Sequence, residues 1–228
     1  MTKTAIMKII KFFAVILIST TFFACSSNEP SGDKAVITEK QDIAVEKGQV
    51  FTVDTTDSRI HFTGYGVGKK HPGTFHLSSG SVAVLNNQIT GGDFIINVRS
   101  LDLDQKEGMF QDKLKPHLLS GDFFDGDKFG TAKFAITKVE PYAANGKDTS
   151  IVEGANFTIS GNLTIKDVTK NVSFPAKVDL DGNTLKAKGN FDINRRDWQM
   201  NYGNDKTLGD KFISEKVTIG LDLKAVKG

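Results

Sequence analysis

Apolar and polar residues alternate along most of the chain from about residue 50 to its end. The alternation is clearest between Gly161 and Pro175, where two such runs meet at the short polar break Lys166-Asp167. Period-two alternation on both sides of a short break predicts a β-hairpin with one apolar face. Because only one face is apolar, we expect the opposite face to contact water.

The same alternation recurs in about eight segments of similar length along the chain. Apolar side chains fall on one face in runs such as Phe94, Ile96 and Val98, and again in Val217, Ile219, Leu221 and Leu223. Strands do not alternate with long helical segments, which indicates an antiparallel sheet. An antiparallel sheet of this size with one apolar face usually closes on itself and so loses its free edges.

Residues 105 to 119 depart from the strand pattern. Phe110, Leu114 and Leu118 recur every four residues among charged neighbours, which predicts a short amphipathic helix. Pro116 lies within this segment and predicts a kink or two short helical pieces. The expected fold is therefore all-β, an antiparallel eight-stranded barrel with a short helical insertion near residues 105–119.

The first 24 residues have the composition of a secretory signal peptide. Three lysines precede or enter a short apolar run, Phe12 to Ile18, which is shorter than the roughly 20 residues of a transmembrane helix. Cys25, the only cysteine, follows Ala24 in an arrangement that resembles a bacterial lipobox, in which the cysteine is lipidated. An ordinary signal peptide that leaves a free thiol is the alternative. We expect an exported bacterial lipoprotein, periplasmic or associated with the outer membrane.

The predicted signal peptide also carries the chain's positive charge. The formal net charge is +2, and removal of Lys3, Lys8 and Lys11 with the signal would leave −1. No basic patch therefore predicts a nucleic-acid partner. Residues 25–47 are polar and of mixed charge, which predicts a flexible tether, and residues 48–228 form the predicted barrel domain.

Three stretches and one short motif are typical of a known family. They are GNLTIKDVTK at 161–170, HLLSGDFFD at 117–125, and Val53-Asp54 followed by Ser58, Ile60 and Phe62 at alternate positions, with Arg196-Asp197-Trp198 near the end. Together they resemble the YceI-like family of exported, lipocalin-like, polyisoprenoid-binding proteins, over essentially all of residues 50–228. The resemblance implies an extended antiparallel barrel whose interior holds a long isoprenoid chain.

Twelve side chains are candidates for the wall of a lipid-binding lumen. They are Ile60, Phe62, Phe75, Phe94, Ile96, Phe134, Ile159, Leu163, Ile165, Phe174, Phe191 and Trp198. The ligand that the resemblance implies is a polyisoprenoid or an isoprenoid quinone, and no other cofactor is expected. Periodicity alone indicates only an apolar interior, which an eight-stranded barrel can either fill with its own side chains or leave open for one ligand.

The chain offers little that is typical of an enzyme or a metal site. His71 and His76 are close in sequence, whereas His61 and His117 are scattered, and a zinc site needs three or four converging ligands. No nucleophile-elbow motif surrounds a serine. We therefore expect no catalytic and no metal-binding residues.

The resulting hypothesis is non-catalytic binding, carriage or storage of a long isoprenoid or similar amphiphilic lipid by an envelope lipoprotein. Its partners would be that lipid and the membrane, reached through the lipid anchor. Two alternatives stay open: a hydrolase or isomerase acting on a lipid in the same cavity, and a ligand-free structural envelope protein. The oligomeric state is also open, and a homodimer is among the options.

Overall fold

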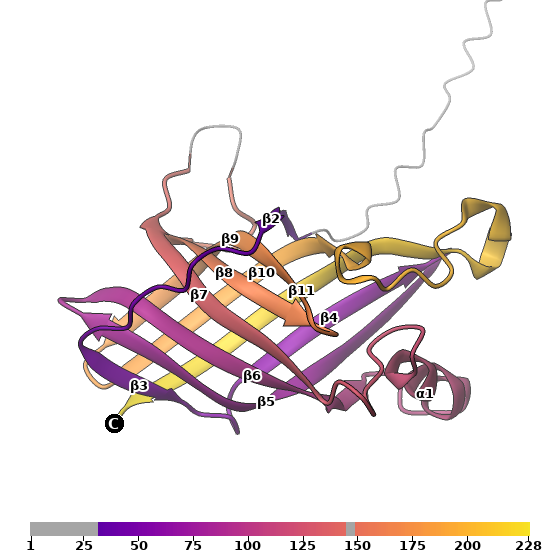
Figure 1. The fold of residues 1–228 in the computed structure, drawn as a ribbon, viewed down its shortest axis with the longest axis horizontal. Helices are drawn as coiled ribbons and strands as arrows, with labels where there is room; N and C mark the ends of the chain where they lie inside the picture. Colours follow the sequence, from indigo (N-terminus) through magenta and orange to yellow (C-terminus); the bar gives the residue numbers. More distant parts are fainter. Residues whose placement is uncertain (1–31, 145–148) are drawn as a thin grey trace, which may run out of the picture. The chain divides into compact units, whose positions relative to one another are not determined.

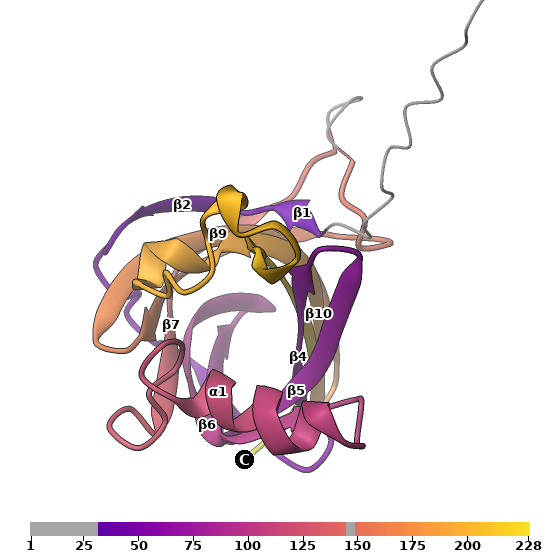
Figure 2. The same ribbon diagram turned by 90° about the vertical axis from the view of Figure 1, so that its right-hand side faces the viewer.

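The computed structural model describes residues 32–144 and 149–228, and the predicted signal peptide and Cys25 lie outside the described residues. Its body is an antiparallel barrel of eight strands, which confirms the predicted fold (Figures 1 and 2). The strands are β4 (Arg59–Gly66), β5 (Lys69–Leu85), β6 (Gln88–Leu103), β7 (Thr131–Pro141), β8 (Phe157–Ile165), β9 (Val168–Asp181), β10 (Thr184–Asn194) and β11 (Ile213–Lys227). Each pairs with the next, and β11 pairs with β4 to close the ring.

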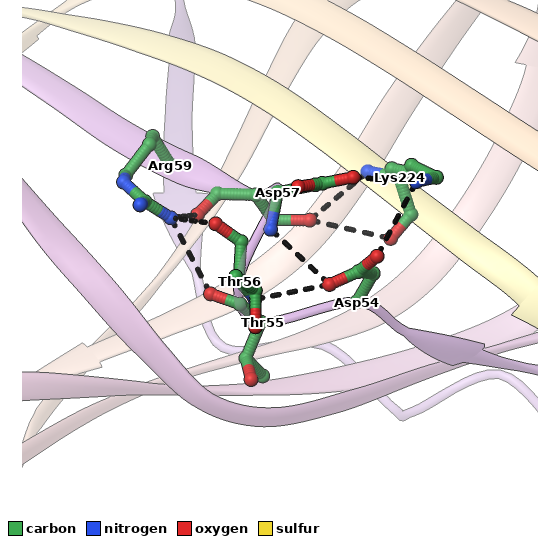
Figure 3. Close-up of polar contacts among 7 residues, drawn as sticks. Asp54, Thr55, Thr56, Asp57, Arg59 and Lys224 are labelled. Carbon is green, nitrogen blue, oxygen red and sulfur yellow. Dashed lines mark hydrogen bonds and ion pairs between the residues drawn. The ribbon is translucent and has the colours of Figure 1, made fainter.

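A short strand, β3 (Gln49–Val53), extends the wall between β5 and β11, and a tight turn joins it to β4 (Figure 3). In this turn the Asp54 carboxylate accepts hydrogen bonds from the backbone N–H groups of Thr56 at 3.0 Å and Asp57 at 3.1 Å. The ammonium group of Lys224 on β11 pairs with both Asp54 and Asp57. The fully buried Ser58 hydroxyl donates to the carbonyl oxygen of Lys224 and accepts its N–H. These side chains fasten the turn to β11.

The segment before β3 is not the flexible tether that the sequence predicted, over the part that the structure describes. β1 (Asp33–Lys34) pairs with β10 in parallel, and β2 (Val36–Glu39) pairs with β9 in antiparallel fashion (Figure 2). The reason lies in the barrel: β9 and β10 pair with each other only near their shared hairpin, from Ala176 against Gly189 onward. Beyond that point their free backbone groups need partners, and β1 and β2 supply them.

The helical insertion is present in two pieces, as Pro116 predicted. A π-helical turn, η1 (Phe110–Leu114), runs directly into α1 (Lys115–Leu119), and Pro116 lies at the start of α1, a position that proline favours. The helix begins at Phe110 rather than at residue 105, because Gly108 has a positive φ of 55°. No helix in the described residues is long and apolar enough to span a membrane.

Candidate functional site: an apolar cavity inside the barrel

The barrel encloses an apolar cavity of about 290 Å³. This volume is just below the range typical of pockets that hold small molecules, roughly 300–1,000 Å³. Every side chain that the sequence placed in the lumen lines the cavity except Trp198. These residues are Ile60, Phe62, Phe75, Phe94, Ile96, Phe134, Ile159, Leu163, Ile165, Phe174 and Phe191.

The lumen stays open although its aromatic rings contact one another. The ring of Phe134 lies 6.2 Å from that of Phe94 and 6.1 Å from that of Phe174, measured between centroids. Phe134 and Leu163 nevertheless remain partly exposed while they line the cavity. Residues of β11 that face the interior, such as Ile219 and Leu221, are also only partly buried. The barrel therefore does not fill its interior with its own side chains.

Small residues on the inner wall explain the free space. Ala132, Ala176 and Ala187 all line the cavity, as does Gly64 of β4. A Cβ added at Gly64 would meet no atom within 4 Å.

The glycine that opens the family-like stretch on β8 serves a different purpose. A Cβ at Gly161 would lie 2.2 Å from the ring of Phe134 on the neighbouring strand. Since this is far inside van der Waals contact, the absence of a side chain at Gly161 lets the Phe134 ring lie against the wall of the barrel. More of the lumen remains empty as a result.

The helical insertion and the loop after β10 contribute to one end of the cavity. Leu114 and Leu118, from the predicted apolar face of the insertion, line the cavity together with Phe124, whose ring meets Phe75 edge-on at 5.2 Å. The imidazole of His117 on α1 packs edge-on against the ring of Tyr202 in the loop, at 4.5 Å. This contact joins the two segments.

Arg195, which the sequence analysis did not single out, is the buried cation of the described residues that line the cavity. It is 3% exposed, and its guanidinium donates to the backbone carbonyl oxygens of Ser214, Met200, Tyr202 and Ile213. Burial lowers its pKa. The sequence alone does not show which of the two adjacent arginines, Arg195 or Arg196, is buried. The four bonds hold the loop between β10 and β11.

Trp198 was predicted to line the lumen, and this prediction is wrong. The side chain is fully buried and donates a hydrogen bond from its indole nitrogen to the carbonyl oxygen of Leu163 on β8, at 3.0 Å. The error arose because β10 ends at Asn194, whose side chain accepts a hydrogen bond from the N–H of Arg196. The chain turns there into a 3₁₀ helix (Arg195–Trp198), and strand alternation no longer applies.

The histidines separate into one that lines the cavity and three that do not. His71 lines it, whereas His61, His76 and His117 are absent from its wall. His61 is exposed, and His117 is paired with Asp122 at 2.8 Å. The described residues contain no group of three His, Cys, Asp or Glu side chains that could hold a metal ion. Among described residues, the wall of the cavity contains no carboxylate.

A closed antiparallel barrel of eight strands around an apolar cavity defines a lipocalin-like class of protein. The YceI-like domain model matches residues 51–225, which covers β4 to β11 almost completely. The chain belongs to the YceI-like domain family.

Curated sequence relatives match about half of the chain. The chain is 34% identical over 107 residues to a UPF0312 protein of Vibrio vulnificus and 33% identical over 114 residues to one of Enterobacter sp. strain 638. These matches cover 46% and 50% of the chain, and it spans about half the length of these curated relatives, 48% of each.

Two solved structures illustrate the shared fold. BcnA of Burkholderia cenocepacia superposes with a TM-score of 0.60 at 21% identity, over 76% of this chain and 99% of BcnA. A polyisoprenoid-binding domain of Saccharophagus degradans, implicated in plant cell wall breakdown, gives 0.59 at 14% identity, over 79% of this chain and 99% of that domain.

Proposed function

We propose that this protein is a non-catalytic carrier of a long isoprenoid, or of a similar amphiphilic lipid, held in the cavity of the barrel. The observation that carries the proposal is the open apolar lumen, in which inward-facing side chains such as Phe134 and Leu163 remain partly exposed. The likeness of the fold to a domain described as polyisoprenoid-binding supports the same ligand class. An isoprenoid quinone belongs to this class.

The energetics favour a carrier that exchanges its ligand. Removing an isoprene unit from water contributes about 4 kcal/mol, at roughly 0.8 kcal/mol per CH₂ group. An isoprenoid in a membrane is already in an apolar environment, so its transfer into this cavity changes the free energy far less. The lipid can therefore leave as well as enter.

The proposal places the protein in the cell envelope, tethered to a membrane through a lipidated Cys25. The lipobox-like sequence before Cys25 supports this part of the proposal. Residues 26–31 would link the anchor to β1, since the segment from Asp33 onward belongs to the barrel wall. Mass spectrometry of the N-terminal peptide, with and without its acyl chains, tests the anchor separately from the cavity.

The lipid-binding proposal is tested by what the purified full chain contains. Native mass spectrometry and solvent extraction should show a bound lipid in the wild type. Ala187 faces the cavity, so Ala187→Phe should fill part of the lumen and reduce bound lipid at least about tenfold, without loss of stability.

The neighbouring Lys186 points outward and is exposed, which makes Lys186→Phe a matched control that adds the same ring outside the barrel. This variant should retain lipid at the level of the wild type. A wild-type protein that carries no lipid under any extraction condition, or equal loss in both variants, would contradict the proposal.

A further inference from the structure

One polar atom on the wall of the cavity is buried without a hydrogen-bond partner. It is Nδ1 of His71, for which no described residue provides a donor or acceptor. His71 lies on β5, and its ring faces that of Phe110 in the helical insertion, with centroids 5.8 Å apart. A buried polar atom without a partner costs free energy, about as much as a lost hydrogen bond. His71 lines the cavity, so a turn of its ring would bring this atom within reach of a ligand there.

Free space lies directly beside this imidazole. Gly64 of β4 is paired in register with His71 and also lines the cavity. Because a Cβ at Gly64 would meet nothing within 4 Å, the wall is recessed at this point. A group at least as large as a methyl group can therefore occupy the recess at Gly64, on the strand next to His71.

The chemistry of this end of the cavity favours an uncharged group. Burial lowers the pKa of His71 below its ordinary value of 6.5, the positive charge of Lys69 acts in the same direction, and the nearby side chain of Gln105 raises the pKa only in part. The imidazole is therefore neutral at neutral pH. Among described residues of the wall, Arg195 already donates to four carbonyl oxygens, and Lys188 is exposed on the outside of β10. A phosphate or carboxylate would find no free cation there.

We propose that His71 and the recess at Gly64 bind the polar end of the isoprenoid, and that this end is an uncharged hydroxyl or carbonyl group that pairs with Nδ1. A neutral imidazole presents either a donor or an acceptor at Nδ1, depending on its tautomer, so it can pair with both kinds of group. The inference rests on the proposed function and adds the orientation of the ligand and the class of its head group.

The test compares three ligands that share a similar chain and differ at the head: geranylgeraniol, geranylgeranyl phosphate and the hydrocarbon phytane. Each is titrated against Nile Red bound to lipid-free full chain at one detergent concentration, so that partition into micelles cancels between variants. His71→Leu should weaken geranylgeraniol binding about tenfold and leave phytane binding within about twofold. His61→Leu removes an exposed histidine from β4 and should change neither.

A second variant addresses the objection that His71→Leu alters the fold. Gly64→Val keeps the imidazole but fills the recess, and should cause the same selective loss for geranylgeraniol with a wild-type thermal unfolding curve. Equal weakening of geranylgeraniol and phytane by His71→Leu, or tightest binding of the phosphate, would overturn the inference while lipid binding itself stands. Failure of all three ligands to bind the wild type would instead remove the proposed function, and the inference with it.

Discussion

The indole nitrogen of Trp198 donates a hydrogen bond to the backbone carbonyl oxygen of Leu163, at 3.0 Å. The bond joins the 3₁₀ helix after β10 to β8, which contains the first part of the family-like stretch at residues 161–170. Leu163 lines the cavity, whereas Trp198 is a fully buried core residue that does not line it. The bond between them ties the loop after β10 to the wall of the cavity.

Replacing Trp198 with Phe should therefore reduce stability without changing lipid binding. The variant loses the hydrogen bond to Leu163 and leaves a void where the larger ring was, so we expect a loss of about 2 kcal/mol in the free energy of unfolding. Urea unfolding followed by circular dichroism measures it, since the only tryptophan is removed. A variant of wild-type stability that carries less lipid would indicate that Trp198 contacts the ligand after all.

Arg195 should be the more sensitive arginine of the Arg195-Arg196 pair. Arg195→Met leaves four backbone carbonyl oxygens without their donor, which should cost about 3 kcal/mol. Arg196 is half exposed and pairs with Glu215 at 3.3 Å, so Arg196→Met should change stability by less than about 0.5 kcal/mol. Denaturant unfolding of both variants provides the comparison, and equal effects would show that the buried guanidinium is not what holds the loop.

The strand alternation predicted which side chains face the lumen because inward and outward positions follow directly from the period of two. It could not predict whether the lumen is open. That depends on how the sizes of side chains from different strands combine, and small residues such as Gly64 and Ala187 are distributed over strands far apart in sequence. In hindsight Gly64 continues the inward series of Ile60 and Phe62, so a missing side chain there was a readable signal.

Two other features are not contained in the alternation of apolar and polar residues. β1 and β2 form because β9 and β10 separate beyond their hairpin and leave backbone groups without partners. The segment that forms β1 and β2 is polar and of mixed charge, and this composition does not predict strands. Likewise, the end of β10 at Asn194 follows from a local cap, which turned Trp198 away from the face that alternation had assigned to it.

Acid should weaken the turn that fastens β3 and β4 to β11. The pKa of Asp54 lies below its ordinary value of 3.8, chiefly because its carboxylate accepts a hydrogen bond from the backbone of Asp57, with Lys224 acting in the same direction. Since the folded-state pKa is the lower one, this stabilisation is complete above the unfolded-state pKa and is lost as the pH falls through the folded-state value.

Asp54→Asn isolates this contribution. The difference in unfolding free energy between wild type and Asp54→Asn should be constant above about pH 5 and shrink between pH 4 and pH 2. Asp102 and Asp205, whose pKa values are also lowered, remain in both proteins and cancel in the difference. A difference in unfolding free energy that is independent of pH over this range would mean that the negative charge of Asp54 does not stabilise the folded protein.

Gly161→Ala should destabilise the barrel through the Phe134 ring. The new methyl group would overlap that ring, and the displaced ring must move toward the lumen, at a cost of about 2 kcal/mol. Phe134→Leu in the same chain removes the overlap, so the double variant should lose less than the sum of the two single variants. Additive losses in thermal and urea unfolding would argue that the conformation of Gly161, rather than its neighbour, is what matters.

The attachment of the segment before β3 should depend on one buried amide. Asn162 is 4% exposed, and its side chain accepts a hydrogen bond from the N–H of Gln41 at 3.0 Å and donates to the carbonyl oxygen of Gln41 at 2.7 Å. Asn171 donates to the same side-chain oxygen, so the amide is fixed in orientation.

Asn162→Ala removes both bonds to Gln41, and residues 33–47 should then exchange their backbone hydrogens about tenfold faster, as measured by mass spectrometry. Gln41→Ala is the matched control: it keeps the backbone groups that Asn162 contacts and should leave exchange unchanged. Unchanged exchange in Asn162→Ala would instead place the attachment in the β1 and β2 ladders and in the backbone bonds that Ala44 makes with Ile136 and Lys47 with the Thr90 hydroxyl.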